Sequence, residues 1–99
     1  MSVRVILHAP TAGALVRARS NARNLLRADP TAEIRILANA QGAAEALRSP
    51  DADGDRHLVL CQNSLRAQNL VAPMGIATVP AVIQALVELQ TAGWLYIRV

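Results

Sequence analysis

Several residue types are scarce in this chain of 99 residues, and each scarcity excludes a class of protein. Cysteine occurs once, so no disulfide can form within the chain, which excludes a small secreted fold held by disulfides. The only aromatic residues besides histidine are Trp94 and Tyr96, whereas nucleic-acid readers usually interleave aromatic and basic side chains. No apolar run approaches the ~20 residues of a membrane-spanning helix. We therefore expect neither a nucleic-acid partner nor a membrane partner.

Lysine is absent as well, and all ten basic residues are arginines, with a net charge of +3. The densest basic group, Arg17, Arg19, Arg23 and Arg27, falls along one predicted helix, and we interpret it as a solvated helix face. A composition of 53% hydrophobic and 17% charged residues excludes disorder. The first four residues lack the apolar stretch of a signal peptide. Together these features predict one cytoplasmic domain over residues 1–99.

Short apolar runs alternate with amphipathic segments along the chain. The expected strands cover residues 3–7, 33–37, 57–60, 76–79 and 94–99, and the expected helices cover residues 11–27, 42–48, 62–68 and 80–91. Thr11 is the expected N-cap of the first helix, and Pro80 the expected first residue of the last. Arg35, among apolar neighbours, indicates a less buried position in the sheet. Five strands separated by four helices predict a three-layer α/β/α domain with a five-stranded, mainly parallel sheet.

Metal and cofactor signatures are missing from the sequence. The acidic loop over residues 49–55 lacks the glycine and glutamate positions of a calcium-binding loop. One thiol and one imidazole do not make a structural zinc site in a single chain. No phosphate loop, dinucleotide-binding fingerprint or hydrolase nucleophile motif occurs. The sequence therefore predicts no metal and no cofactor.

The carboxyl ends of parallel strands lie along one edge of a sheet, and chemistry-bearing residues follow several of the predicted strands there. Cys61 joins the third strand to the next helix, where backbone N–H groups favour a thiolate. His8 follows the first strand and either supports that thiolate or only hydrogen-bonds a loop. Asn39 follows the second strand and either binds a ligand or only caps a helix. His57, at the opposite end of the sheet, is interpreted as a surface residue. A buried, unreactive Cys61 is the alternative.

Three segments carry a family resemblance: Arg35–Gly42, Leu58–Leu65, and Gly75–Ala81 followed by Leu86–Trp94. Through them the whole chain resembles a small single-domain member of the DsrE/DsrF-like sulfur-relay family. The resemblance implies an α/β/α fold, assembly as trimers or hexamers, and a persulfide carried on the cysteine after the third strand, which is Cys61 here. The helix after it carries Leu65-Arg66-Ala67-Gln68, where dedicated relay subunits tend to carry an Arg-Gly pair.

Two functions follow as hypotheses. In the first, Cys61 carries sulfur between donor and acceptor proteins with support from His8, and Asn39, Gln62, Asn63 and Ser64 form the surrounding ligand-binding surface. In the second, the chain is a non-catalytic oligomeric binding module with a structural cysteine. A cysteine hydrolase has little support, because no acid that would orient His8 is evident.

The last predicted helix carries two apolar stripes. One of them covers the sheet and consists of Ala81, Val82, Ala85, Leu86 and Leu89. Ile83 and Val87 fall outside it, and they either form a partner surface or are two scattered surface aliphatics. With the resemblance, we expect a homo-oligomer.

Overall fold

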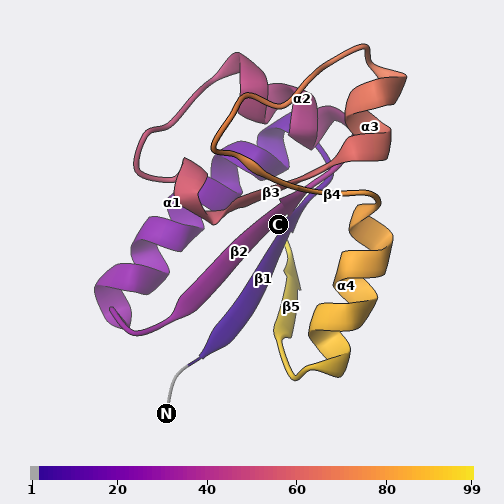
Figure 1. The fold of residues 1–99 in the computed structure, drawn as a ribbon. Coiled ribbons are helices and arrows are strands. Elements are labelled where there is room, and N and C mark those ends of the chain that lie inside the picture. The colour runs from indigo at the N-terminus through magenta and orange to yellow at the C-terminus, as the bar shows by residue number, and fades with distance from the viewer. Residues whose placement is uncertain (1–2) are drawn as a thin grey trace.

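The computed structural model describes residues 3–99, whose strands form one open parallel sheet (Figure 1). The five strands are β1 (Arg4–Ala9), β2 (Glu33–Ala38), β3 (Leu58–Cys61), β4 (Ala77–Val79) and β5 (Leu95–Arg98). They pair in the order β4-β3-β2-β1-β5, and every pair is parallel. The predicted α/β fold class is confirmed, and β2 lies at the centre of the sheet.

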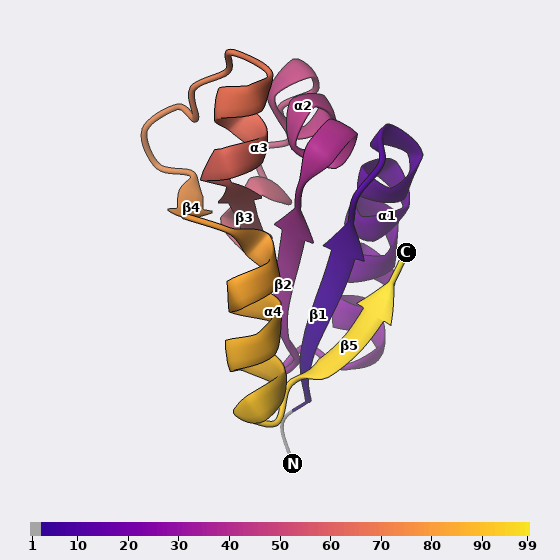
Figure 2. The ribbon, with the colours of Figure 1, turned by 90° about the vertical axis from the view of Figure 1, so that its right-hand side faces the viewer.

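Helices cover both faces of this sheet, but unequally. Helices α1 (Ala12–Ala28) and α2 (Ala40–Arg48) pack on one face, and the short α3 (Gln62–Ala67) contacts α2 on that side. Helix α4 (Val82–Thr91) packs alone on the other face, where it buries Ile6 of β1 but leaves β5 uncovered (Figure 2). Within residues 3–99, no helix combines the length and the apolar character needed to cross a membrane.

The alternation of side chains along the strands divides the core into two clusters. Val5, Leu7 and Ala9 of β1 belong to the larger cluster under α1 and α2. Ile6 belongs to the smaller cluster under α4, and its other buried members are Leu37, Cys61, Val82, Ala85, Leu86 and Trp94. His8, two residues after Ile6, therefore faces the α4 side of the sheet.

Helix α1 follows the predicted pattern closely. The Thr11 hydroxyl accepts a hydrogen bond from the backbone N–H of Ala14 at 3.0 Å, so Thr11 is the N-cap as predicted. Helix α2 approaches the end of β1 so closely that only glycine fits at position 42. A Cβ atom there would lie 1.9 Å from the carbonyl oxygen of Ala9. Gly42 thereby fixes the distance between α2 and the carboxyl edge of the sheet.

Several element boundaries differ from the prediction. Helix α2 begins at Ala40 rather than Gly42, and α4 begins at Val82, two residues after Pro80. Pro80 instead offers its carbonyl oxygen to the backbone N–H of Asn63 at 3.2 Å. Arg35 is exposed as predicted, although it lies on the central strand rather than near an edge. The α4 side of the sheet accommodates it because one helix cannot cover five strands.

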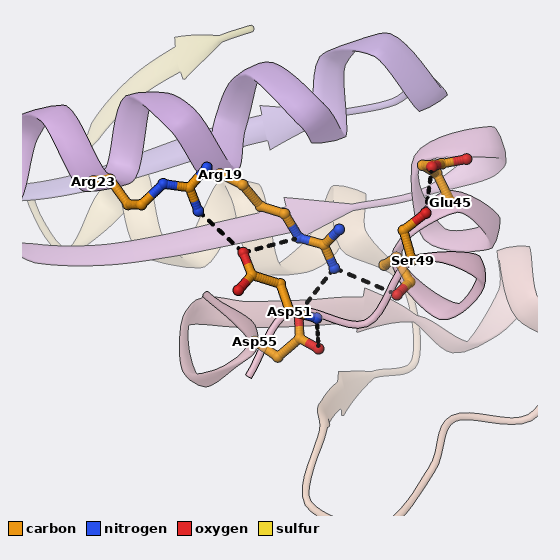
Figure 3. A network of polar contacts seen from close by, with 7 residues as sticks. Arg19, Arg23, Glu45, Ser49, Asp51 and Asp55 are labelled. Atoms are coloured by element: carbon orange, nitrogen blue, oxygen red, sulfur yellow. Dashed lines mark hydrogen bonds and ion pairs between the residues drawn. The ribbon is translucent and has the colours of Figure 1, made fainter. Parts of the chain in front are cut away.

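The basic helix face is not fully solvated, which corrects the interpretation from the sequence. Arg19 is 7% exposed, and its Nη2 atom donates to Asp55 Oδ1 at 2.9 Å. Arg23 donates to Asp51 Oδ2 at 3.1 Å, so two turns of α1 hold the acidic loop (Figure 3). The loop's carboxylates therefore balance buried arginine charge.

Candidate functional site

Cys61 is the last residue of β3 and also the N-cap of α3, so it lies at the carboxyl edge of the sheet. Its side chain is 6% exposed and packs in the apolar cluster under α4. The Ser64 hydroxyl and the backbone N–H groups of Asn63, Ser64 and Val82 lie around the sulfur, and each of them lowers the pKa of the thiol. The N-terminal turns of α3 and α4 therefore both supply donors to one sulfur atom.

These donor groups lower the pKa of the Cys61 thiol. Burial alone raises the pKa of Cys61, because it removes water from the thiolate. The hydrogen bonds from Ser64, Val82 and Asn63 together outweigh burial and lower the pKa below its ordinary value. A buried cysteine without such donors would show the opposite shift. The surroundings of Cys61 thus favour the anion.

Ser64 links the sulfur to the loop after β2. Its hydroxyl oxygen accepts from the backbone N–H of Ala40 at 2.8 Å, which leaves its proton for the sulfur. Ala40 has a positive φ of 48°, a left-handed conformation that residues other than glycine rarely adopt. Gln68 holds the same turn, because its Nε2 atom donates to the carbonyl oxygens of Ala40 and Ser64, both at 3.0 Å. The Ala40 turn is a strained segment held in place at the candidate site.

His8 takes part in a separate chain of hydrogen bonds. Its Nε2 atom lies 3.0 Å from Asn39 Oδ1, and its Nδ1 atom lies 2.6 Å from the Tyr96 hydroxyl. An amide oxygen only accepts, so Nε2 carries a proton, and in the neutral imidazole Nδ1 accepts from the Tyr96 hydroxyl. Asn39 is at the N-cap position of α2, yet its side chain makes no capping bond, since it orients His8 instead. The side chain that orients the His8 ring is therefore the amide of Asn39, a role that the sequence did not reveal.

The strand order separates His8 from Cys61. Strand β2 lies between β1 and β3, so the two residues are two strand spacings apart sideways, or roughly 10 Å, and Cys61 lies two residues further along its strand, because His8 is level with Val59. Among residues 3–99, His8 hydrogen-bonds Asn39 and Tyr96 and not Cys61. His8 reaches the thiol region only through Asn39, whose neighbour Ala40 donates to Ser64.

The other predicted ligand-binding residues are occupied by contacts within the protein. Gln62 Nε2 donates to Thr78 Oγ1 at 2.9 Å, which ties α3 to β4. Asn63 Oδ1 accepts from Arg66 at 3.0 Å, while its backbone N–H serves Cys61. Ser64 is the one residue of this segment whose side chain lowers the pKa of Cys61. In the part of the chain from residue 3 onward, no three histidine, cysteine or acidic side chains cluster as a metal site would require.

Two participants were missed by sequence reasoning. Tyr96 contacts His8 only because β5 pairs with β1, and strand order does not follow from the sequence. The backbone N–H of Val82 reaches the sulfur because α4 begins beside the end of β3. No signal in the side-chain pattern identifies a backbone donor. Both contributions depend on topology rather than on residue type.

Two cavities adjoin the site's elements. One of about 450 Å³ lies between α3 and the segment after it, and Gln62, Arg66 and Met74 are among its lining residues. The other, of about 410 Å³, lies between α4 and the β3–β4 half of the sheet. When the chain is compared with known proteins, no family model and no curated protein matches it.

Proposed function

We propose that this protein is a sulfur carrier that holds a persulfide on Cys61. The observation that supports the proposal is the place of Cys61 at the carboxyl end of β3 and the start of α3, where the Ser64 hydroxyl and three backbone N–H groups lower the pKa of the thiol despite burial. The thiolate is the nucleophile in sulfur exchange, so donors that favour it also favour loading. The resemblance to the DsrE/DsrF-like family agrees with this role.

The proposed reaction is an exchange without net oxidation. The Cys61 thiolate attacks the outer sulfur of a donor persulfide, and a new S–S bond forms as the donor's own S–S bond breaks. The donor leaves as a thiolate, and the proton of the outer sulfur stays with the transferred atom. An acceptor thiolate then attacks that outer sulfur and releases the Cys61 thiolate. Donor and acceptor supply the second thiol each time, so one cysteine per chain suffices.

Ser64 and the backbone N–H groups would stabilise the anion at both stages of this cycle. His8 is a positioning residue in the proposal, because it orients Asn39 at the start of the Ala40 turn. That turn places the N–H that engages Ser64. Replacing His8 should therefore change the thiol less than replacing Ser64.

We further propose that the carrier works as a cytoplasmic homo-oligomer, a trimer or a hexamer. Ile83 and Val87 are 69% and 59% exposed on α4, outside the stripe that packs on the sheet. Two large aliphatic side chains one turn apart form an apolar surface that a second copy would cover. Reducing conditions in the cytoplasm keep a carrier thiol free between transfers.

The test is intact-protein mass spectrometry after incubation with glutathione persulfide, followed by removal of the excess donor. The native chain should gain the mass of one sulfur atom, and the Cys61→Ser variant should gain none. A second incubation with a small acceptor thiol should remove the added sulfur. A native chain that stays unmodified after long incubation, while the unfolded chain becomes modified, would refute the carrier.

One observation favours the alternative, a non-catalytic binding module. Cys61 is 6% exposed among apolar side chains, as a structural cysteine would be. Under this alternative Cys61→Ala retains every ligand interaction and loses only packing. Under the carrier hypothesis Cys61→Ala retains the fold and loses loading completely. Loading of the native chain, compared with the thermal stability of Cys61→Ala, separates the two functions: a carrier loads, whereas a binding module with a structural cysteine does not load but loses stability in the variant.

A further inference from the structure

The cavity between α4 and the sheet lies on the same face as Cys61, but toward the amino ends of the strands. Its volume of about 410 Å³ falls in the range of small-molecule pockets. Its floor is apolar and includes Leu37, Val59 and Val79, while Ala85 and Leu89 of α4 form one wall. Cys61 does not line it. The cavity is therefore distinct from the thiol site.

Positive charge gathers at one end of this cavity. Arg35 and Arg56 line it, and among residues 3–99 neither forms an ion pair with a carboxylate. Arg35 lies on the central strand, and its guanidinium stacks on the Trp94 ring, with the carbon 4.7 Å from the ring centroid. This stacking holds the guanidinium in one orientation. Because Arg35 is exposed and forms no ion pair among residues 3–99, its guanidinium can meet an anion from solvent.

The remaining polar groups define the charge more closely. Burial, reinforced by the neighbouring Arg56, lowers the pKa of His57, so its imidazole is neutral at pH 7. Glu88 of α4 supplies the one carboxylate of the lining, against two guanidinium groups. His57, interpreted from the sequence as a plain surface residue, is half-buried and lines the cavity. The lining thus has a net positive charge over an apolar floor.

We infer that this cavity binds a small organic anion with an apolar body, such as an aryl or alkyl carboxylate or sulfonate. The anionic group would pair with Arg35 and Arg56, which offer planar, forked donors suited to two oxygen atoms. The apolar body would lie along Val59 and Leu89. Neither sulfur transfer nor Cys61 is needed for this binding.

The chain contains a built-in reporter, because Trp94 is its only tryptophan and contacts Arg35. The probe is 1-anilinonaphthalene-8-sulfonate, whose emission is sensitised by tryptophan, and its neutral relative N-phenyl-1-naphthylamine lacks the sulfonate. We expect saturable binding of one sulfonate probe per chain, about tenfold tighter than the neutral probe, as charge-assisted bonds at such a site imply.

Matched variants locate the binding. Arg56→Gln and Arg35→Gln should each weaken the sulfonate probe about tenfold and leave the neutral probe unchanged. Glu88→Gln should tighten the sulfonate probe about twofold, because it removes the opposing charge. Ala77→Phe, at an exposed lining position, should block both probes by filling the cavity.

Arg17→Gln, on α1, removes one exposed charge outside this cavity and serves as the control, with no effect expected. Among residues 3–99, the guanidinium groups over the Trp94 ring are those of Arg4 and Arg35, not that of Arg56, so the Arg56 variant tests the charge even where Arg35→Gln disturbs folding. Equal affinity for the two probes would overturn the inference. So would sulfonate binding that survives both Arg56→Gln and Ala77→Phe, or that Arg17→Gln weakens as much as Arg56→Gln does. Loading of Cys61 plays no part in this readout, so the sulfur-carrier proposal stands or fails separately.

Discussion

Replacing Ser64 with alanine tests whether hydrogen bonds control the Cys61 thiolate. The variant removes the hydroxyl donor to the sulfur and keeps the three backbone N–H donors. A hydrogen bond to a charged group contributes about 1.5–3 kcal/mol, and one pKa unit corresponds to about 1.4 kcal/mol. Ser64 is partly exposed, so water replaces some of the lost interaction. We therefore expect the pKa of Cys61 to rise by about one unit, at the lower end of that range.

The assay is the rate of alkylation by iodoacetamide between pH 5 and 10, followed by mass spectrometry. Nucleophilicity grows with pKa, with a Brønsted coefficient of about 0.5, so the thiolate of the variant is roughly threefold more reactive. At neutral pH its thiolate is about tenfold scarcer, which leaves the variant roughly threefold slower than the native chain. Above both midpoints the variant becomes the faster of the two. The two rate profiles must therefore cross.

Burial of the thiol does not change the pH midpoint that this assay measures. Restricted access multiplies the rate at every pH by the same factor and does not move the midpoint. Asn63→Ala is the matched control, because it removes the neighbouring side chain and keeps the backbone N–H that serves the sulfur. Its midpoint should equal that of the native chain. A Ser64→Ala midpoint that stays in place, or profiles that do not cross, would refute the proposed electrostatics.

Four other predictions follow from the same structure. Gly42→Ala should destabilise the fold by about 3 kcal/mol or more in urea unfolding, because its Cβ would meet the Ala9 carbonyl at 1.9 Å. Gly13→Ala, where a Cβ meets nothing closer than 3.4 Å, should instead stabilise by about 0.5–1 kcal/mol, and equal destabilisation would contradict the argument. Arg19→Met should lower the free energy of unfolding by about 2–4 kcal/mol, because it leaves the Asp55 carboxylate without its cation. A change within error of zero would contradict the stabilising role of this ion pair. The pKa of Cys61 is lower in the folded than in the unfolded chain, so the thiol stabilises the fold increasingly as the pH rises from the folded pKa to about 8.5. The measurement is the free energy of unfolding of the native chain minus that of Cys61→Ala as a function of pH. A difference that stays constant over that window would contradict the prediction. Ile83→Glu with Val87→Glu should reduce the particle mass in light scattering, whereas Gln84→Glu should not, and a native chain that is already monomeric would contradict the interface.

Much of the fold could be predicted because each signal was local. Apolar alternation located the strands, and the hydroxyl of Thr11 marked the start of α1. The prediction of Pro80 as a first helical residue was wrong, since the chain first uses Pro80 to accept a bond from Asn63. A hydrogen bond between two separate segments cannot be predicted from the helix and strand propensities of either segment. The buried Arg19 was missed for the same reason, because its partner Asp55 lies 36 residues away.

The candidate site shows where local signals stop being sufficient. Placing Cys61 at the carboxyl edge needed only the alternation of strands and helices, and its surroundings of N–H donors then followed from its place between β3 and α3. Placing His8 needed the strand order, because all parallel strands bring their ends to the same edge. Of the possible orders, only those with β1 beside β3 bring the imidazole directly to the thiol. The observed order inserts β2, and with it Asn39, between them. His8 therefore acts on the thiol region through an amide and a backbone turn, and His8→Ala should move the alkylation midpoint by less than Ser64→Ala does.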